Sequence, residues 1–277
     1  IMAGRLPKPG RISLSPMLSY RGKLYGDLTV ACLDENEFMV FGSGAAQEMH
    51  RRWFESHIDK FNLSYSNRSD EYHGLSIAGP NSRKVLEKIV RDDVSNEKFK
   101  FRDSRRMFVG GVPAIINRIS FTGELGYEIY VAPHYQLKLY EELMEAGKEF
   151  NIKPFGGRAL MSMRLEKNWG AWTLDYRPDF TAKETGLDAF INWEKEFIGK
   201  ESAQKENSSN KLVPLIVETN EIDVTNNEAV LNGDQSIGYV TSGGFAHFVN
   251  KSVAFTFVDQ KNIKSENKIQ VEINGDL

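Results

Sequence analysis

The chain has 277 residues, of which 40% are hydrophobic and 26% are charged, and this composition is ordinary for a soluble globular protein of one large domain or two smaller ones. Its 35 basic and 38 acidic residues leave a net charge of -3, which gives no electrostatic footprint for nucleic acid or an anionic membrane. No apolar run approaches the ~20 residues that span a bilayer.

Cys32 is the only cysteine, so internal disulfides and thiolate metal clusters are excluded. It lies inside the strand pattern "LTVACL", where a buried, unreactive thiol is the expected state. A reducing, cytoplasmic setting fits this single thiol.

Three strand patterns joined by short turns open the chain and predict an antiparallel meander over residues 11–18, 24–33 and 37–44. Residues 45–58 follow as a helix, because apolar residues recur at helical spacing at Met49, Trp53 and Phe54.

The middle of the chain mixes both kinds of pattern. Strands are expected at residues 73–80, 105–120 (as a hairpin), 126–131 and 186–193. Helices are expected at residues 81–90, 134–150 and 155–167, and residues 196–206 are expected to form a turn into a short helix. Asn81 or Ser82 is positioned to cap the first of these helices, and Leu160 and Met163 are expected to face inward from the third.

The polar run "NSSNK" at residues 207–211 is the best candidate for a domain boundary. After it come only strand patterns, as in a small barrel or sandwich. The sequence therefore predicts an α+β domain over residues 1–206 and a separate all-β domain over residues 212–277.

The stretch "SFTGELGYEIYVAP" holds the first candidate site residue. Period-two alternation places Tyr127, Ile129 and Val131 on one face of a strand and Glu128 with Tyr130 on the other. A carboxylate in so apolar a strand either lies on a solvated face, which the pattern alone favours, or meets a partner that offsets its burial.

Asp27 in "KLYGDLTVACL" is the second candidate, an acid among apolar residues directly after Gly26. A glycine next to an acid within a strand permits close approach of a ligand or of another backbone. The alternative is a solvated acid at the edge of a sheet.

Other candidates have equally ordinary explanations. Arg158 and Arg164 lie six residues apart on different faces of one predicted helix, as on a salt-bridged surface. Trp172 and Tyr176 lie in a loop, where they either fill a gap in the core or form a stacking wall for a flat ligand.

Several familiar sites are excluded or disfavoured. The run from Gly42 to Gly44 resembles a dinucleotide fingerprint, but Gln47 stands where a third small residue is needed. None of the five histidines has metal-ligand spacing, so no metal is predicted, and His50 and His57 are expected to be surface or capping residues. No G-x-S-x-G elbow supports a serine hydrolase.

Six stretches, taken together and in order, resemble the folate-dependent aminomethyltransferase family, which includes the glycine cleavage T-protein. They are "RISLSPMLSYRGKLYGDLTV", "LSIAGPNSRKVL", "SFTGELGYEIYV", "GGRALMSMRLEK", "TGLDAFINWEKEFIGKES" and "SIGYVTSGGFAHFVNKSVAFTFV". "GRISLSPML", "FMVFGSGAAQ" and "TSGGFAHFVNKSVA" are most similar to the folate-binding C-terminal half of dimethylglycine and sarcosine dehydrogenases. The resemblance implies the family's folate-binding α+β fold followed by a small C-terminal β-barrel, in a chain truncated at both ends.

The resemblance also implies roles for individual residues. Glu128 matches the strand glutamate that binds the pterin ring of tetrahydrofolate, and Asp27 matches the catalytic aspartate beside the reactive folate nitrogens. Arg158 matches an arginine that organises the site and the anionic end of folate. The remaining implied folate-binding residues are Val40, Phe121, Tyr127, Trp172 and Tyr176, with Phe121 standing where a tyrosine is common.

The implied function is tetrahydrofolate-dependent one-carbon transfer to form 5,10-methylenetetrahydrofolate. Its expected partners are small molecules, namely the folate and a methylated amine or its iminium, with no nucleic acid and no membrane. FAD is expected only in a preceding part that oxidises an N-methyl amine such as dimethylglycine or sarcosine. The alternatives are a stand-alone aminomethyltransferase or demethylase, and a non-catalytic folate-binding regulatory protein, which would lack the acid at Asp27.

Overall fold

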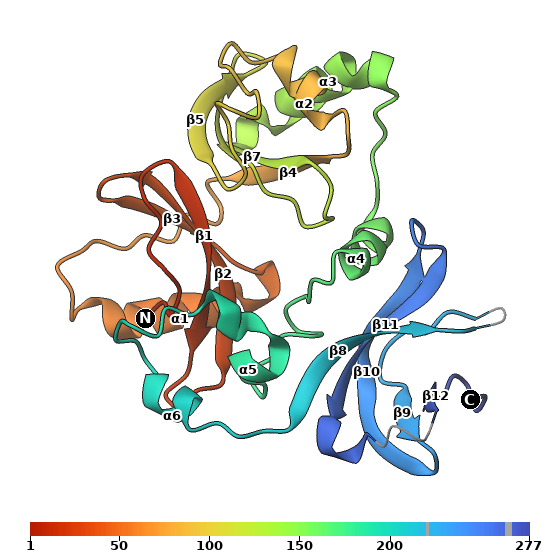
Figure 1. The fold of residues 1–277 in the computed structure, drawn as a ribbon. Coiled ribbons are helices and arrows are strands. Elements are labelled where there is room, and N and C mark those ends of the chain that lie inside the picture. The colour runs from red at the N-terminus through yellow and green to blue at the C-terminus, as the bar shows by residue number, and fades with distance from the viewer. Residues whose placement is uncertain (220–221, 264–267) are drawn as a thin grey trace.

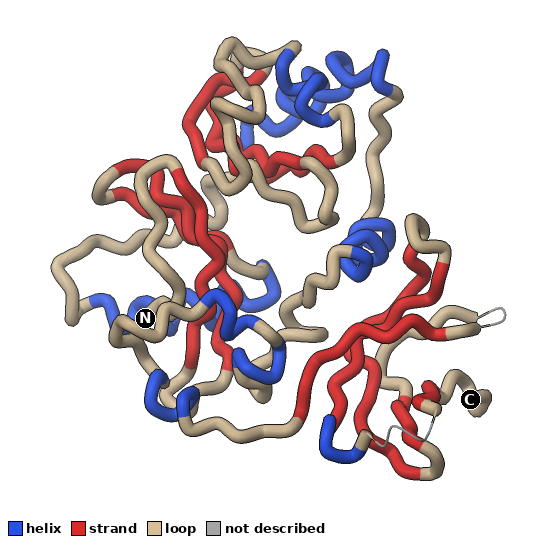
Figure 2. Tube along the Cα trace, in the orientation of Figure 1, coloured by secondary structure: helices blue, strands red, loops and turns tan. Residues whose placement is uncertain are grey.

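The computed structural model describes residues 1–219, 222–263 and 268–277, which form three antiparallel sheets of three, four and five strands. Figure 1 shows the three sheets around one short helix, α4 (Gly157–Glu166), which lies near the middle of the molecule. Helices accompany the first two sheets, whereas Figure 2 shows the chain from residue 210 onward almost entirely as strand and loop.

The first sheet is the predicted meander of β1 (Arg11–Leu18), β2 (Leu24–Asp34) and β3 (Glu37–Phe41), in the order β1-β2-β3. Along β2 the buried residues alternate with half-buried ones from Leu24 to Val30, as a strand with one covered face requires. A 3-10 turn (Gly44–Ala46) leads into α1 (Gln47–Ile58), which confirms the predicted helix.

The two histidines of α1 correct a prediction, because both His50 and His57 are buried instead of lying at the surface or capping the helix. His50 Nε2 donates to the carbonyl of Tyr25 at 2.9 Å. His57 Nδ1 donates to the carbonyl of Trp53 at 2.7 Å, which leaves Nε2 to accept from the hydroxyl of Tyr20 at 2.7 Å. Burial is tolerated because the ring nitrogens find hydrogen-bond partners.

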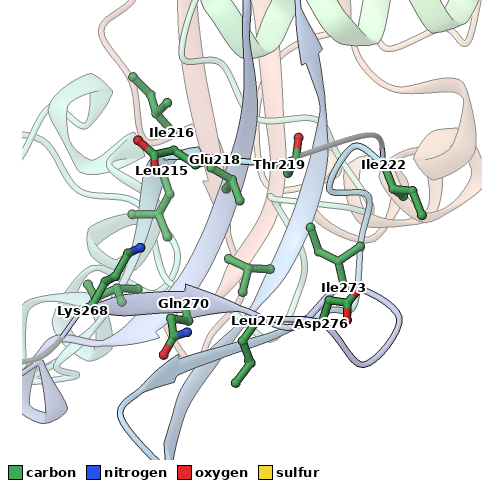
Figure 3. A pocket seen from close by; sticks show the side chains of 13 residues that line it. Leu215, Ile216, Glu218, Thr219, Ile222, Lys268, Gln270, Ile273, Asp276 and Leu277 are labelled. Atoms are coloured by element: carbon green, nitrogen blue, oxygen red, sulfur yellow. The ribbon is translucent and has the colours of Figure 1, made fainter.

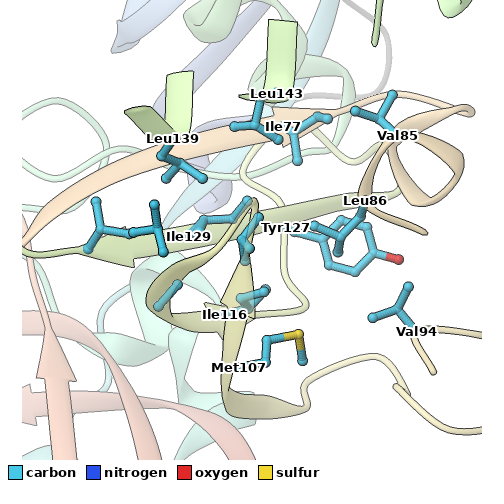
Figure 4. Close-up of a cluster of buried hydrophobic side chains, with 14 of the residues drawn as sticks. Ile77, Val85, Leu86, Val94, Met107, Ile116, Tyr127, Ile129, Leu139 and Leu143 are labelled. Atoms are coloured by element: carbon cyan, nitrogen blue, oxygen red, sulfur yellow. The ribbon is translucent and has the colours of Figure 1, made fainter. Parts of the chain in front are cut away.

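The second sheet has the order β4-β7-β6-β5 and includes the predicted hairpin. Its strands are β4 (His73–Ala78), β5 (Ser104–Val109), β6 (Val112–Asn117) and β7 (Gly126–Val131). One face packs against α2 (Ser82–Glu87) and α3 (Gln136–Gly147), and Figure 4 shows the resulting core, which includes Tyr127, Ile129 and Leu139.

Local capping departs from the prediction. Asn81 precedes α2, but its side chain makes no capping hydrogen bond within the described residues. The hydroxyl of Ser82 donates instead to the carbonyl of Leu125 at 2.9 Å and so ties the helix to the turn before β7. A full capping box occurs elsewhere, where Thr181 and Glu184 cap each other's backbone N–H groups at the start of α5 (Ala182–Thr185).

The strand predicted at residues 186–193 is wrong, because residues Leu187–Phe190 form a 3-10 helix. Gly186 has a φ of 76°, a left-handed conformation that ends α5 and starts the next turn. A short apolar run fits a strand and a buried helical turn equally well, and here packing of Leu187 into the core decides for the turn.

The third sheet has the strand order β12-β9-β10-β11-β8 and follows α6 (Lys200–Gln204). Its strands are β8 (Asn210–Val217), β9 (Ala229–Asn232), β10 (Gln235–Ala246), β11 (Lys251–Asp259) and β12 (Ile269–Val271). The sheet curls into a half-barrel, as expected (Figure 1). A pocket of about 860 Å³ lies between β8, β12 and the residues that follow them (Figure 3), and the predicted site residues are not among its described lining residues.

A buried carboxylate joins α4, the loop after it and the half-barrel. Asp175 is fully buried and pairs with Arg164 Nη1 at 2.5 Å. It also accepts from the backbone N–H of Ala171 at 2.9 Å and from the hydroxyls of Thr241 and Ser242, at 2.5 and 2.6 Å, on β10. The donors come from α4, from the loop after it and from β10, so this one side chain fixes the relative positions of these three segments.

The same pair corrects the predicted orientation of α4. Arg164 and Leu165 are its buried residues, whereas Leu160 and Met163 are half-buried. Arg164, expected on a salt-bridged surface, is instead 1% exposed. A buried arginine is stable only with a partner, and Asp175 supplies it from a position eleven residues along the chain.

We expect Asp175→Ala to lower the free energy of unfolding by about 3–5 kcal/mol, because it leaves the Arg164 cation buried without its carboxylate. Asp179→Ala is the matched control, because its ion pair with Arg177 is exposed and such pairs contribute about 0–1 kcal/mol. Urea unfolding of both variants checks this, and similar losses in the two would contradict it.

Candidate functional site

Each of the two candidate acids lies in a strand that has one buried face, and each acid points from the opposite face of its strand. On β2, Gly26 and Leu28 are buried while Asp27 is half-buried on the opposite face. On β7, Tyr127 and Ile129 enter the core while Glu128 is half-buried on the other face. Neither acid lies on a fully solvated surface.

These two faces meet through one aromatic contact. Thr29 lies two residues after Asp27 and pairs with Phe41 on β3, so Phe41 shares the face of Asp27. The ring centroid of Phe41 lies 4.4 Å from that of Tyr130, and Tyr130 donates its hydroxyl hydrogen to Glu128 Oε2 at 2.7 Å. The faces that carry the acids are therefore neighbours and do not lie on opposite sides of the molecule.

The end of α4 and the loop after it approach both acids. Lys167 Nζ donates to the carbonyl of Ser120 at 2.6 Å, and its charge acts on Glu128. Further along the loop, burial raises the pKa of Tyr176, and the charge of Asp27 adds a smaller effect in the same direction. The structure thus brings Asp27, Glu128 and Tyr176 toward a common region.

Burial is the main influence on both acids. It raises the pKa of Asp27 to about 7, against a smaller opposing effect from its own backbone N–H. It also raises the pKa of Glu128, and here the hydroxyl of Tyr130 and the ammonium of Lys167 oppose the effect. Two acids with perturbed protonation in one region are typical of functional sites.

Trp172 and Tyr176 are buried in the loop after α4. The Tyr176 hydroxyl accepts from the backbone N–H of Gly170 at 3.1 Å, and a Cβ at Gly170 would lie 2.4 Å from the Tyr176 ring. The Trp172 ring centroid lies 5.8 Å from that of His50 on α1. Both aromatic residues belong to the buried cluster that includes Leu18 of β1 and Leu24 of β2, so they help to pack the loop against the first sheet.

A pocket of about 560 Å³ borders this region between β3, α1 and residues 64–72. Its lining includes Val40, Ser43 and Tyr130. A Cβ at Gly42 would lie 2.6 Å from Leu28, so close packing against β2 explains this glycine without a dinucleotide site.

Three of the predicted folate-binding residues do not lie beside the two acids. Tyr127 is fully buried on the opposite face from Glu128, stacks on Phe99 at 5.8 Å and accepts a hydrogen bond from Arg83. The structure does not bring it to the site, because successive residues of a strand point to opposite faces. Arg158 is exposed in the first turn of α4, and Phe121 is half-buried before β7.

Tyr130 and Lys167 are site residues that the sequence analysis did not propose. Strand alternation already places Tyr130 on the face of Glu128, so that signal was present. Lys167 has no local signal, because its approach to Glu128 depends on how α4 packs against the turn before β7.

In the ranges that the structure describes, no three histidine, cysteine or acidic side chains lie close enough together to hold a metal ion. Over the same ranges no helix has the length and apolar character needed to cross a bilayer.

Comparison with known proteins decides the family. The sequence profile of the GCVT N-terminal domain matches residues 1–195, and that of the glycine cleavage T-protein C-terminal barrel domain matches residues 210–277. The chain belongs to the glycine cleavage T-protein family. The resemblance seen in the six sequence stretches is confirmed.

Two kinds of protein in this family are similar to the chain, namely dehydrogenases and aminomethyltransferases. Human mitochondrial dimethylglycine dehydrogenase is 34% identical over 99% of the chain, which spans only 33% of that protein. The aminomethyltransferase of Thermoanaerobacter pseudethanolicus is 29% identical over 97% of the chain and 73% of its own length. The chain thus spans about a third of the dehydrogenases that it matches.

A solved relative supports the fold. The glycine cleavage system aminomethyltransferase T from Bartonella henselae superposes with a TM-score of 0.84 at 23% identity, over 98% of this chain and 74% of that one. The predicted aminomethyltransferase fold, with helices and antiparallel sheets followed by a barrel domain, is confirmed.

The raised pKa of Asp27 predicts a pH-dependent stability. Between the ordinary value of 3.8 and about 7, the folded chain holds a proton that the unfolded chain has lost, so stability falls as pH rises through this window. Asp27→Asn cannot ionise, and we expect its stability relative to the parent to rise by about 3–4 kcal/mol from about pH 4 to about pH 8.

Urea unfolding at both pH values measures this difference. Asp34→Asn is the matched control, since Asp34 lies exposed at the end of the same strand. A stability difference between Asp27→Asn and the parent that stays constant with pH would show that Asp27 is not titrating in this window.

Proposed function

We propose that this chain is a tetrahydrofolate-dependent one-carbon transfer module. The observation that carries the proposal is the pair of half-buried acids, Asp27 and Glu128, on strand faces that meet through Phe41 and Tyr130. Membership of the T-protein family over nearly the whole chain supports the same function.

Glu128 would bind the pterin ring. The 2-amino group and the adjacent ring N–H of a reduced pterin form a planar edge with two donors, and a carboxylate can accept from both. Such pairing would offset the cost of burying Glu128, which burial otherwise drives toward its neutral form.

Asp27 would act beside the reactive folate nitrogens. There it would stabilise positive charge that develops as the one-carbon unit is captured, and it would accept a proton. A pKa of about 7 suits this role, because such a group can hold or release a proton near neutral pH.

Other predicted site residues would surround the two acids. Trp172 and Tyr176 would form the wall behind Asp27, and Phe121, half-buried before β7, would border the pterin region. Val40 pairs with Val30 on the face of the first sheet opposite to Asp27, where it lines the pocket of about 560 Å³ together with Tyr130. Arg158, exposed at the start of α4, would meet the anionic end of the folate. Tyr127 is left out of this set because its side chain lies in the core.

We further propose that the whole protein is an FAD-dependent dimethylglycine or sarcosine dehydrogenase that forms 5,10-methylenetetrahydrofolate. The 34% identity to human dimethylglycine dehydrogenase over 99% of the chain supports it. The FAD would be held outside these residues. The single buried thiol of Cys32 fits a reducing, cytoplasmic setting, although the dehydrogenase relatives are named as mitochondrial.

A stand-alone aminomethyltransferase is the second candidate, and the bacterial relative that matches over 73% of its own length supports it. The coding sequence upstream of Ile1 distinguishes the two. A long upstream region with a dinucleotide fingerprint supports the dehydrogenase, and a start codon after a short extension supports the aminomethyltransferase.

We expect Glu128→Gln to weaken tetrahydrofolate binding by about 1.5–3 kcal/mol, the contribution of a hydrogen bond to a charged group. Glu124→Gln, an exposed acid in the preceding turn, serves as the control and should bind as the parent does. Calorimetric titration measures both affinities. If Glu128→Gln bound with the parent's affinity, Glu128 would be removed from the site.

We expect Asp27→Asn to leave folate affinity largely intact and to slow methylenetetrahydrofolate formation by about 10²-fold or more. In the parent, the rate should rise with pH through about 7 as Asp27 loses its proton, and this step should vanish in the variant. Turnover equal to that of the parent would remove Asp27 from the catalytic role, and an absence of turnover in both proteins would favour the non-catalytic folate-binding alternative.

A further inference from the structure

The carboxylate of Glu128 is held by a residue of its own strand. Tyr130 lies two positions further along β7, on the same face, and its hydroxyl donates to Glu128 Oε2 at 2.7 Å. Among the described residues this is the hydrogen bond that fixes the carboxylate. The family match alone does not explain why a tyrosine stands beside this acid.

The Tyr130 ring is confined on two sides. The ring of Phe41 packs against it with the centroids 4.4 Å apart. On β4 its register partner is Gly74, where a Cβ would lie only 3.0 Å from Tyr130 Cε1. A larger residue at Gly74 would push against the ring, so the glycine and Phe41 together hold the hydroxyl in one place.

We propose that Tyr130 is a positioning residue for folate binding, which orients the Glu128 carboxylate and keeps it ionised so that it can accept two N–H donors from the pterin. The inference rests on the proposed function. A carboxylate has about four acceptor sites, so the bond from Tyr130 leaves both oxygens free to accept again.

Ionisation matters because the pterin edge offers donors. Once protonated, Glu128 would present its own O–H to an N–H group and lose one acceptor position. Burial pushes Glu128 toward that neutral form, and the two groups that oppose it are the Tyr130 hydroxyl on β7 and the Lys167 ammonium after α4. Its register partners, Ser76 on β4 and Asn117 on β6, carry no charge.

Tyr130 should outweigh Lys167. The hydroxyl makes a direct hydrogen bond to the carboxylate in a half-buried place. Lys167 makes no hydrogen bond to the carboxylate within the described residues and acts on it by charge alone, because its ammonium, which burial drives toward a lower pKa, donates to the carbonyl of Ser120.

Tyr130→Phe tests the proposal, because it removes the hydroxyl and keeps the ring that packs between Phe41 and Gly74. We expect tetrahydrofolate affinity at neutral pH to fall about tenfold, as for the loss of one charge-assisted hydrogen bond. The pH below which binding is lost should move upward, because Glu128 would protonate more readily. The rate at saturating folate should stay that of the parent, so that KM changes and kcat does not.

Two further variants sharpen the result. Tyr140→Phe removes an exposed hydroxyl on α3 and should match the parent in affinity and pH dependence. Lys167→Met should cause a smaller loss than Tyr130→Phe, because Lys167 acts on Glu128 by charge without a direct hydrogen bond to it. Thermal melts of all variants show whether each remains folded.

The possible outcomes distinguish a failure of the role of Tyr130 from a failure of the proposed folate-binding function. If Tyr130→Phe keeps the parent's affinity and pH profile while Glu128→Gln loses binding, the role of Tyr130 is overturned and the folate site stands. If Tyr130→Phe loses affinity equally at every pH, its role is structural and the inference is again overturned. If the parent itself does not bind tetrahydrofolate, both are overturned.

Discussion

The buried pair of Asp175 and Arg164 is the interaction on which the arrangement of this molecule depends. Taking either charge out of water costs several kcal/mol, and only the other partner with its surrounding donors offsets that cost. Because the donors come from α4, from its following loop and from β10, the pair is satisfied in one arrangement only. That arrangement also sets where Tyr176 and Lys167 stand.

The acids of the candidate site have fewer hydrogen-bond partners than the acid of this junction. Asp175 is surrounded by donors, whereas Asp27 and Glu128 are half-buried with few partners, and burial raises the pKa of each. Buried acids with free acceptor positions contribute little to stability, but they can bind a ligand or a proton. The same fold thus supplies one fully paired acid for structure and two under-paired acids for chemistry.

Local patterns predicted the elements whose periodicity was strong. The meander β1-β2-β3 and the helix α3 were found because one face of each is covered and the apolar residues repeat at the matching period. Residues 186–193 failed because a short apolar run does not distinguish a strand from a helical turn. Burial of His50 and Arg164 was missed because each depends on a partner supplied by another element.

The sequence by itself determined the family, the strand faces of Asp27 and Glu128, and the barrel-like tail, since motif order and period-two alternation are local properties of the chain. Only the tertiary structure decided that those two faces meet, that Tyr130 holds Glu128, and that Tyr127 belongs to the core. The reason is physical: alternation says which way a side chain points, but the burial and pairing of a charge depend on what the rest of the chain packs against it.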